Sequence, residues 1–137
     1  MIKVYTAGTW DMFHVGHLNI FKKSKELGTH LIVGVSTDEL VYSYKKHYPI
    51  IPFENRIELI KSCKYVDEVV PQTKLLDPED LKHICPNVFT IGTDWKGKEL
   101  PGIKFLRKIG TKIVYFNYTE EISSSIIKER LAAIYKG

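Results

Sequence analysis

The sequence has few cysteines and no long apolar run. Its 137 residues include two cysteines, Cys63 and Cys85, which lie far apart without a C-x-x-C motif. This spacing argues against a disulfide framework and against a zinc site. No run of about 18 apolar residues occurs, so we expect no membrane insertion. The start, Met1 to Tyr5, lacks the features of a signal peptide, and we expect a cytoplasmic protein.

A strong charge of either sign is also missing. Twenty Lys and Arg residues stand against 16 Asp and Glu residues, for a net charge of +4. The lysines are scattered along the chain and do not form a dense stripe with aromatic residues, so we expect no nucleic-acid surface. A mild positive charge suits a smaller anionic ligand. The length fits one domain over residues 1–137, and 44% apolar residues are enough for a packed core.

Short apolar runs alternate with longer amphipathic ones. The short runs predict five strands, at residues 2–6, 31–35, 69–70, 88–91 and 113–116. The amphipathic runs predict helices over 17–27 and 103–109, and from Pro52, Pro78 and Ser123 onward. This alternation is typical of an α/β fold with a parallel sheet covered on both faces. Residues 38–51, rich in lysine and tyrosine, are predicted to form a loop near the ligand-binding edge.

The most informative segment joins the first predicted strand to the first predicted helix. It reads T-A-G-T-W-D-M-F-H-V-G-H from Thr6 to His17. In a parallel sheet this junction lies at the carboxyl edge, and the helix start offers unpaired N–H groups to an anion. His14 and His17 flank Gly16 there, so their imidazoles are placed to donate N–H bonds to a phosphoryl group. Simple capping histidines are the alternative, but two of them around a glycine favour function.

T-W-D-M-F-H-V-G-H resembles the G-T-F-D-x-x-H-x-G-H signature of the nucleotidyltransferase superfamily, and most closely its cytidylyltransferase branch. Three later stretches are similar to the same branch: K-Y-V-D-E-V from Lys64, G-T-D-W-K-G-K from Gly92 and E-I-S-S-S from Glu121. The stretch from Gly92 resembles glycerol-3-phosphate cytidylyltransferase in particular. The resemblance implies a Rossmann-like, doubly wound, single α/β domain whose five parallel strands follow the order 3-2-1-4-5.

The resemblance also implies a reaction. A small phosphomonoester, with glycerol 3-phosphate as the leading acceptor, attacks the α-phosphate of CTP and releases pyrophosphate. Mg²⁺ accompanies CTP, and the protein is expected to be a homodimer. The catalytic residues are predicted to be His14, His17 and Lys46. The nucleotide-binding residues are predicted to be Thr9, Trp10, Asp11, Gly16, Gly92, Asp94, Ser123 and Ser124. Acceptor binding is predicted for Lys45, Arg56 and Lys64, and indirect metal binding through the Mg-triphosphate for Asp11.

Several alternatives stay open. Arg56 and Lys64 could instead pair with Asp67 and Glu68, and Lys64 stands where many family members have arginine, whose bidentate fork it lacks. The arginine that usually begins the family's last motif is absent at Asn117-Tyr118. Phosphocholine, phosphoethanolamine or another phosphorylated polyol could be the acceptor. An ATP-dependent adenylyltransferase similar to FAD synthetase and a non-catalytic nucleotide-binding protein are the rival functions.

Overall fold

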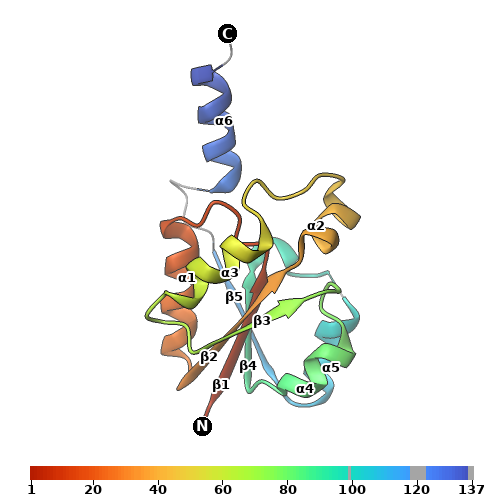
Figure 1. Cartoon of the computed structure of the whole chain (residues 1–137). Coiled ribbons are helices and arrows are strands. Elements are labelled where there is room, and N and C mark those ends of the chain that lie inside the picture. Colours follow the sequence, from red (N-terminus) through yellow and green to blue (C-terminus); the bar gives the residue numbers. More distant parts are fainter. Residues whose placement is uncertain (99, 118–122, 136–137) are drawn as a thin grey trace.

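The structure, a computed structural model, describes residues 1–98, 100–117 and 123–135 (Figure 1). The predicted alternation of strands and helices is confirmed. In chain order the elements are β1 (Lys3–Gly8), α1 (Val15–Glu26), β2 (His30–Ser36), α2 (Asp38–Lys45), α3 (Phe53–Lys61), β3 (Glu68–Gln72), α4 (Pro78–Ile84), β4 (Val88–Gly92), the 3-10 turn η1 (Thr93–Trp95), α5 (Pro101–Lys108), β5 (Lys112–Phe116) and α6 (Ser124–Tyr135).

The five strands form one parallel sheet in the order β3-β2-β1-β4-β5, as predicted. Strand β1 lies at the centre and pairs with β2 on one side and β4 on the other. The chain therefore leaves the carboxyl ends of β1 and β4 in opposite directions, and such a switch point opens a crevice that ligands occupy. The doubly wound fold places the candidate site at this edge.

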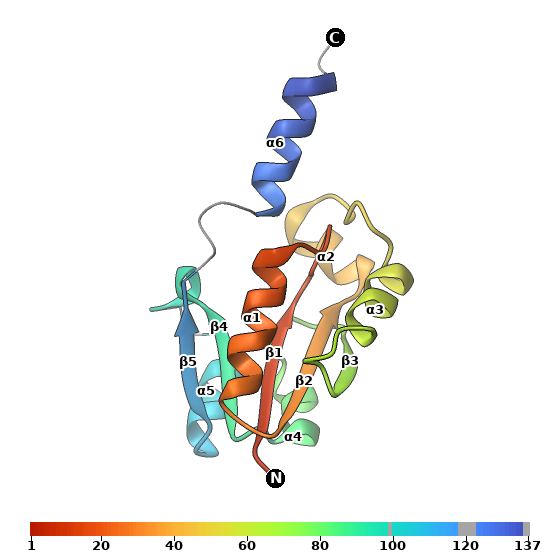
Figure 2. The same cartoon turned by 90° about the vertical axis from the view of Figure 1, so that its left-hand side faces the viewer.

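Helices cover both faces of the sheet (Figures 1 and 2). On one face, α1 and α3 supply Phe21 and Ile60, which pack with Val4 and Val33 of the central strands. On the other face, α4 and α5 pack on a second apolar cluster that includes Phe89. Full burial of such side chains contributes about 1.5–3 kcal/mol each, so the two clusters make the sheet a rigid platform for its carboxyl edge.

Residues 38–45 form helix α2, so the loop predicted over 38–51 was wrong in its first half. The Thr37 side chain accepts a hydrogen bond from the Leu40 N–H and caps the helix. Leu40 and Val41 bury the inner face, while the helix ends at Lys46, whose φ is 64°. The irregular segment is therefore residues 46–52, which we call the strap.

Helix α6 begins where the sequence predicts but does not cover the sheet. None of its side chains is buried, and it extends beyond the carboxyl edge of the strands (Figures 1 and 2). Its first residue, Ser124, donates a hydrogen bond from Oγ to the Asp11 carbonyl at 2.8 Å, so the helix start lies at the candidate site. The motif residues Glu121 and Ile122, and Tyr118 of the arginine-less stretch, lie outside the described residues. Within the described ranges, no helix has both the length and the apolarity needed to cross a membrane.

Candidate functional site

A cavity of about 400 Å³ opens at the carboxyl edge of the sheet. Its walls come from the turn after β1, the strap with the end of α2, the end of β4 with η1, and the start of α6. The structure thus brings together segments that lie more than 100 residues apart. The predicted site residues that line the cavity are Thr9, Trp10, Asp11, His14, Gly16, His17, Lys45, Gly92, Asp94, Ser123 and Ser124.

The two histidines form a stacked pair at the start of α1. His14 is the N-cap residue, and its Nδ1 accepts a hydrogen bond from the Gly16 N–H at 3.1 Å. Nδ1 of His17 accepts from the His14 N–H at 3.4 Å, and the ring centroids lie 3.8 Å apart. Because each Nδ1 is an acceptor, this network assigns the proton of each neutral ring to Nε2. Both side chains are therefore donors through Nε2.

His14 Nε2 is buried and has no hydrogen-bond partner within the described part of the chain. A buried donor without an acceptor costs free energy, so native proteins leave few of them. This atom belongs to a residue that lines the cavity. An oxygen of a bound anion would satisfy it.

Burial keeps both imidazoles uncharged at neutral pH. Burial and, to a lesser extent, the neighbouring His14 together lower the pKa of His17 to about 3, against an opposite effect of Asp11. Burial also lowers the pKa of His14 below its ordinary value. Two stacked imidazolium rings would repel each other, whereas two neutral rings do not. The pair can thus donate hydrogen bonds to phosphate oxygens, while the full positive charges must come from other groups.

The turn before the histidines has an unusual backbone. Trp10 and Met12 both have positive φ, 57° and 51°, a conformation that is costly for residues other than glycine. The Trp10 indole is buried, donates from Nε1 to the Gly34 carbonyl at 2.9 Å and meets His17 edge-on at 5.4 Å. A Cβ at Gly8 would lie 3.0 Å from this indole. Gly8, which also lines the cavity, thus makes room for Trp10.

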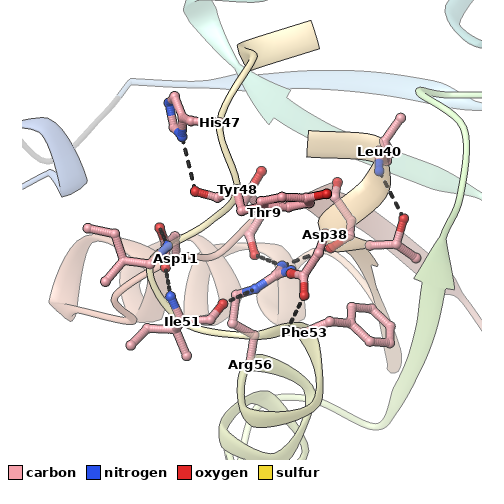
Figure 3. Close-up of polar contacts among 12 residues, drawn as sticks. Thr9, Asp11, Asp38, Leu40, His47, Tyr48, Ile51, Phe53 and Arg56 are labelled. Carbon is pink, nitrogen blue, oxygen red and sulfur yellow. Dashed lines mark hydrogen bonds and ion pairs between the residues drawn. The ribbon is translucent and has the colours of Figure 1, made fainter. Parts of the chain in front are cut away.

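Asp11 anchors the strap. Its Oδ2 accepts from the Ile50 N–H at 2.8 Å and its Oδ1 from the Ile51 N–H at 2.9 Å (Figure 3). Each carboxylate oxygen thus accepts one backbone N–H of the strap. In the part of the chain that the structure describes, no group of three His, Cys, Asp or Glu residues could hold a metal ion. The predicted indirect contact with Mg²⁺ stays a prediction.

Two lysines line the cavity. Lys45 ends α2 beside Tyr44, with its Nζ 6.0 Å from the tyrosine ring centroid. Lys128 of α6 was missed by the sequence analysis, although it lies four residues after Ser124 and so on the same helix face. Lys46, predicted to be catalytic, does not line the cavity; its Nζ donates to the Ser43 carbonyl at 3.1 Å.

The prediction that Arg56 binds the acceptor is not supported, because its guanidinium is buried and bound to the chain itself. It is 1% exposed and donates to three backbone carbonyls and to Asp38, its actual partner (Figure 3). The alternative pairing of Arg56 with Asp67 or Glu68 was wrong, because its carboxylate partner is Asp38.

Lys64 does not line the cavity either. Its Nζ lies 5.2 Å from the Tyr65 ring centroid. Its predicted alternative partners bind other residues: Asp67 pairs with Lys25, and Glu68 pairs with His30. Lys64 is therefore placed away from the residues that could contact a substrate.

Two buried polar residues at the strand ends also line the cavity and were missed. Ser36 ends β2 and Gln72 ends β3, and Gln72 Nε2 donates to Ser36 Oγ at 3.0 Å. They are 1% and 4% exposed, so their polar groups face protein and cavity rather than bulk water. The sequence signal that could have identified them is a polar residue at the carboxyl end of an apolar strand, because the carboxyl ends of parallel strands meet at the ligand-binding edge. This part of the cavity offers a hydroxyl and an amide.

Known proteins resemble this chain over nearly its whole length. A family model described as cytidylyltransferase-like matches residues 5–130. The chain is 38% identical over 136 residues to the glycerol-3-phosphate cytidylyltransferase of Bacillus subtilis (strain 168), which covers 98% of this chain and 100% of that protein. It is 34% identical over 140 residues to the FAD synthase of Pyrococcus abyssi (strain GE5 / Orsay), and this alignment covers 98% of this chain and 95% of that protein.

A solved structure agrees with these relatives. The lipopolysaccharide core biosynthesis protein from Thermoplasma volcanium GSS1 aligns with a TM-score of 0.72 at 28% sequence identity. The alignment covers 87% of this chain and 97% of that one. The relatives thus share the domain as a whole, including the edge at which the cavity lies.

Proposed function

Because the chain belongs to the cytidylyltransferase-like family and is therefore a nucleotidyltransferase, we propose that it transfers the cytidylyl group of CTP to glycerol 3-phosphate. The observation that supports this most is the stacked pair of neutral imidazoles at the start of α1. Its buried His14 Nε2 has no acceptor within the described residues, and a phosphate oxygen of CTP supplies one.

The proposed reaction is a single displacement at phosphorus. An oxygen of the acceptor phosphate forms a bond to the α-phosphorus of CTP, the bond from that phosphorus to the bridging oxygen of the β-phosphate breaks, and pyrophosphate leaves. The acceptor oxygen is already anionic, so no strong general base is needed. Nε2–H groups of His14 and His17 donate to α- and β-phosphate oxygens, where negative charge shifts toward the leaving group.

Charge neutralisation comes from groups other than the histidines, because these are neutral. Lys45 and Lys128 line the cavity, and the N-termini of α1 and α6 add their positive dipole ends. Mg²⁺ enters with CTP as part of the substrate, bound by phosphate oxygens and water, and neutralises phosphate charge. This fits the engaged carboxylate of Asp11, since no protein cage for the ion is required.

The acceptor is proposed to bind in the part of the cavity between the strap and the ends of β2 and β3. Lys45, Ser36 and Gln72 line the cavity there, and we propose that Lys45 binds the acceptor phosphate and that Ser36 and Gln72 bind its hydroxyl groups. A neutral polar lining suits the hydroxyl groups of glycerol 3-phosphate, whereas the charge of an ammonium head would need a carboxylate or an aromatic cage. Of the carboxylates that line the described cavity, Asp11 is bound to the strap and Asp94 follows β4 on the other side.

Pyrophosphate release tests the proposal. The protein is incubated with Mg²⁺ and either CTP or ATP, together with glycerol 3-phosphate, phosphocholine, phosphoethanolamine or flavin mononucleotide. We expect the fastest release with CTP and glycerol 3-phosphate. A clear preference for ATP and the flavin would assign the chain to the function of its FAD synthase relatives. No release with any pair would favour a nucleotide-binding protein. The homodimer stays a prediction, which light scattering after size exclusion checks.

A further inference from the structure

The strap, residues 46–52, forms one wall of the cavity without any regular structure of its own. Its residues His47 and Pro49 line the cavity. It is held by side chains from outside: the Asp11 carboxylate accepts the N–H groups of Ile50 and Ile51, and Arg56 binds the Ile51 carbonyl. The position of this wall therefore depends on a small number of polar contacts.

Arg56 connects the strap to the rest of the ligand edge (Figure 3). Its Nε donates to the Ile51 carbonyl at 2.9 Å, and its Nη1 donates to the Thr9 carbonyl at 2.7 Å and the Ser36 carbonyl at 2.8 Å. One guanidinium thus joins the strap, the turn after β1 and the end of β2. All three segments contribute residues to the cavity wall.

Asp38 completes the arrangement. Its Oδ1 accepts from Arg56 Nη2 at 2.6 Å, and its Oδ2 accepts from the Phe53 N–H at 3.3 Å, at the point where the strap enters α3. Arg56 is 1% exposed, so its charge requires this carboxylate. A lysine could not replace it, because an ammonium lacks the planar fork that reaches several acceptors in fixed directions.

We propose that Arg56, oriented by Asp38, is a positioning residue that sets the separation between the acceptor and the nucleotide. The Thr9 carbonyl belongs to the turn that presents His14 and His17, while Ile51 belongs to the strap, which follows Lys45. A change in the contact between them moves one substrate relative to the other. Its kinetic consequence rests on the proposed function, because displacement needs the reacting atoms about 3–3.5 Å apart and a shift of about 1 Å costs about 100-fold in rate.

The kinetic test compares Arg56→Lys with a matched control, Asp67→Asn. Like Asp38, Asp67 pairs with a cation, Lys25, and accepts a backbone N–H, that of Leu31. Unlike Asp38, it lies at the amino end of β3, whereas the cavity lies at the carboxyl ends of the strands. Steady-state rates and CTP affinity are measured well below each variant's melting temperature. We expect kcat of Arg56→Lys to fall about 10- to 100-fold while the Kd for CTP changes less than about threefold, and Asp67→Asn to keep both values. Equal losses in the two variants, or an unchanged kcat in Arg56→Lys, would overturn the inference.

Hydrogen exchange separates this inference from the proposed function, because it needs no turnover. In Arg56→Lys and in the milder Asp38→Asn, the amides of Ile50 and Ile51 should exchange at least about tenfold faster, with β1 and β2 unchanged. If the wild type released no pyrophosphate, the proposed function would fail and this measurement would still decide. Unchanged strap amides, or faster exchange throughout the sheet, would show that the pair does not position the strap.

Discussion

The two walls of the cavity are held in different ways. The turn between β1 and α1 is fixed mainly by its own residues: His14 and His17 cap the helix that they begin, and the Trp10 side chain reaches into the core, while Arg56 and Ser124 each add one contact from outside. The strap is fixed by Asp11, Asp38 and Arg56, which come from three other segments. The comparison separates two tasks. The turn carries the donors for the nucleotide, and the strap carries the geometry between the substrates.

The largest expected effect tests the turn. His17→Ala removes one donor to the phosphates, and kcat should fall about 100-fold or more, the scale for the loss of one transition-state hydrogen bond. Circular dichroism should show that the variant folds. His83→Ala on α4, an exposed histidine outside the cavity, serves as the control and should keep the wild-type rate. A near-normal rate in His17→Ala would mean that the turn is only structural.

The cations are expected to act on binding. Lys128→Ala should weaken CTP binding about tenfold, measured by isothermal titration in Mg²⁺, and Lys45→Ala should raise the KM for glycerol 3-phosphate about tenfold, each as expected for a charge-assisted hydrogen bond. Raising the salt concentration should narrow the difference from the wild type, since salt screens exposed charges. Lys82→Ala is the control: it removes a lysine of α4 that pairs with Glu79, and it should leave CTP affinity and the KM for glycerol 3-phosphate unchanged. Wild-type CTP affinity in Lys128→Ala and a wild-type KM in Lys45→Ala would remove the lysines from the site.

Gln72→Leu sharpens the description of the strap side. It removes the amide at the end of β3, and the preference for glycerol 3-phosphate over propyl phosphate, which lacks the hydroxyls, should fall about tenfold in kcat/KM. The rate with propyl phosphate is the internal control and should not fall. If both acceptors lose equally, Gln72 supports the fold and does not read hydroxyls.

The smallest effect concerns pH. The pKa of His17 is about 3 in the folded protein and about 6.5 when the ring is solvated, so the unfolded state binds the extra proton between these values. The free energy of unfolding should therefore decrease as pH falls from about 6.5 toward 3, and His17 should contribute no change above that range. Urea unfolding at pH 7 and pH 5 should show a smaller decrease for His17→Asn than for the wild type. Equal decreases in the free energy of unfolding for the two proteins would contradict the claim that His17 is buried and neutral.

Much of the fold could be predicted because it depends on local patterns. Apolar runs placed all five strands, and the order of the sheet followed the family resemblance. Helix α2 was missed because its eight residues include two exposed tyrosines and two buried apolar residues, too few for a clear period. The signals were the Thr37 cap and the acidic first turn. Helix α6 was placed correctly along the chain, but no sequence pattern indicates that it extends beyond the sheet.

The sequence predicted the residues of the turn better than the contacts that hold the strap. The cavity residues between Thr9 and His17 belong to one short motif, and they were all identified. The sequence could not reveal the role of Arg56. Its backbone partners lie 5 to 47 residues away along the chain, and hydrophobic periodicity gives no information on such contacts, so the arginine was assigned to the acceptor. A charge on a half-apolar helix looks the same whether it binds a ligand or the backbone. Burial decides between these roles, and it follows from the tertiary structure.

The central claim is that two neutral imidazoles donate Nε2–H bonds to the triphosphate. Nitrogen-15 NMR of the histidine side chains, recorded at pH 7 before and after addition of CTP and Mg²⁺, tests it most directly. The account predicts that His14 and His17 are Nε2–H tautomers in the free protein and that both Nε2 protons shift downfield with CTP. Charged rings in the free protein, or Nε2 signals that do not respond to the nucleotide, would contradict it.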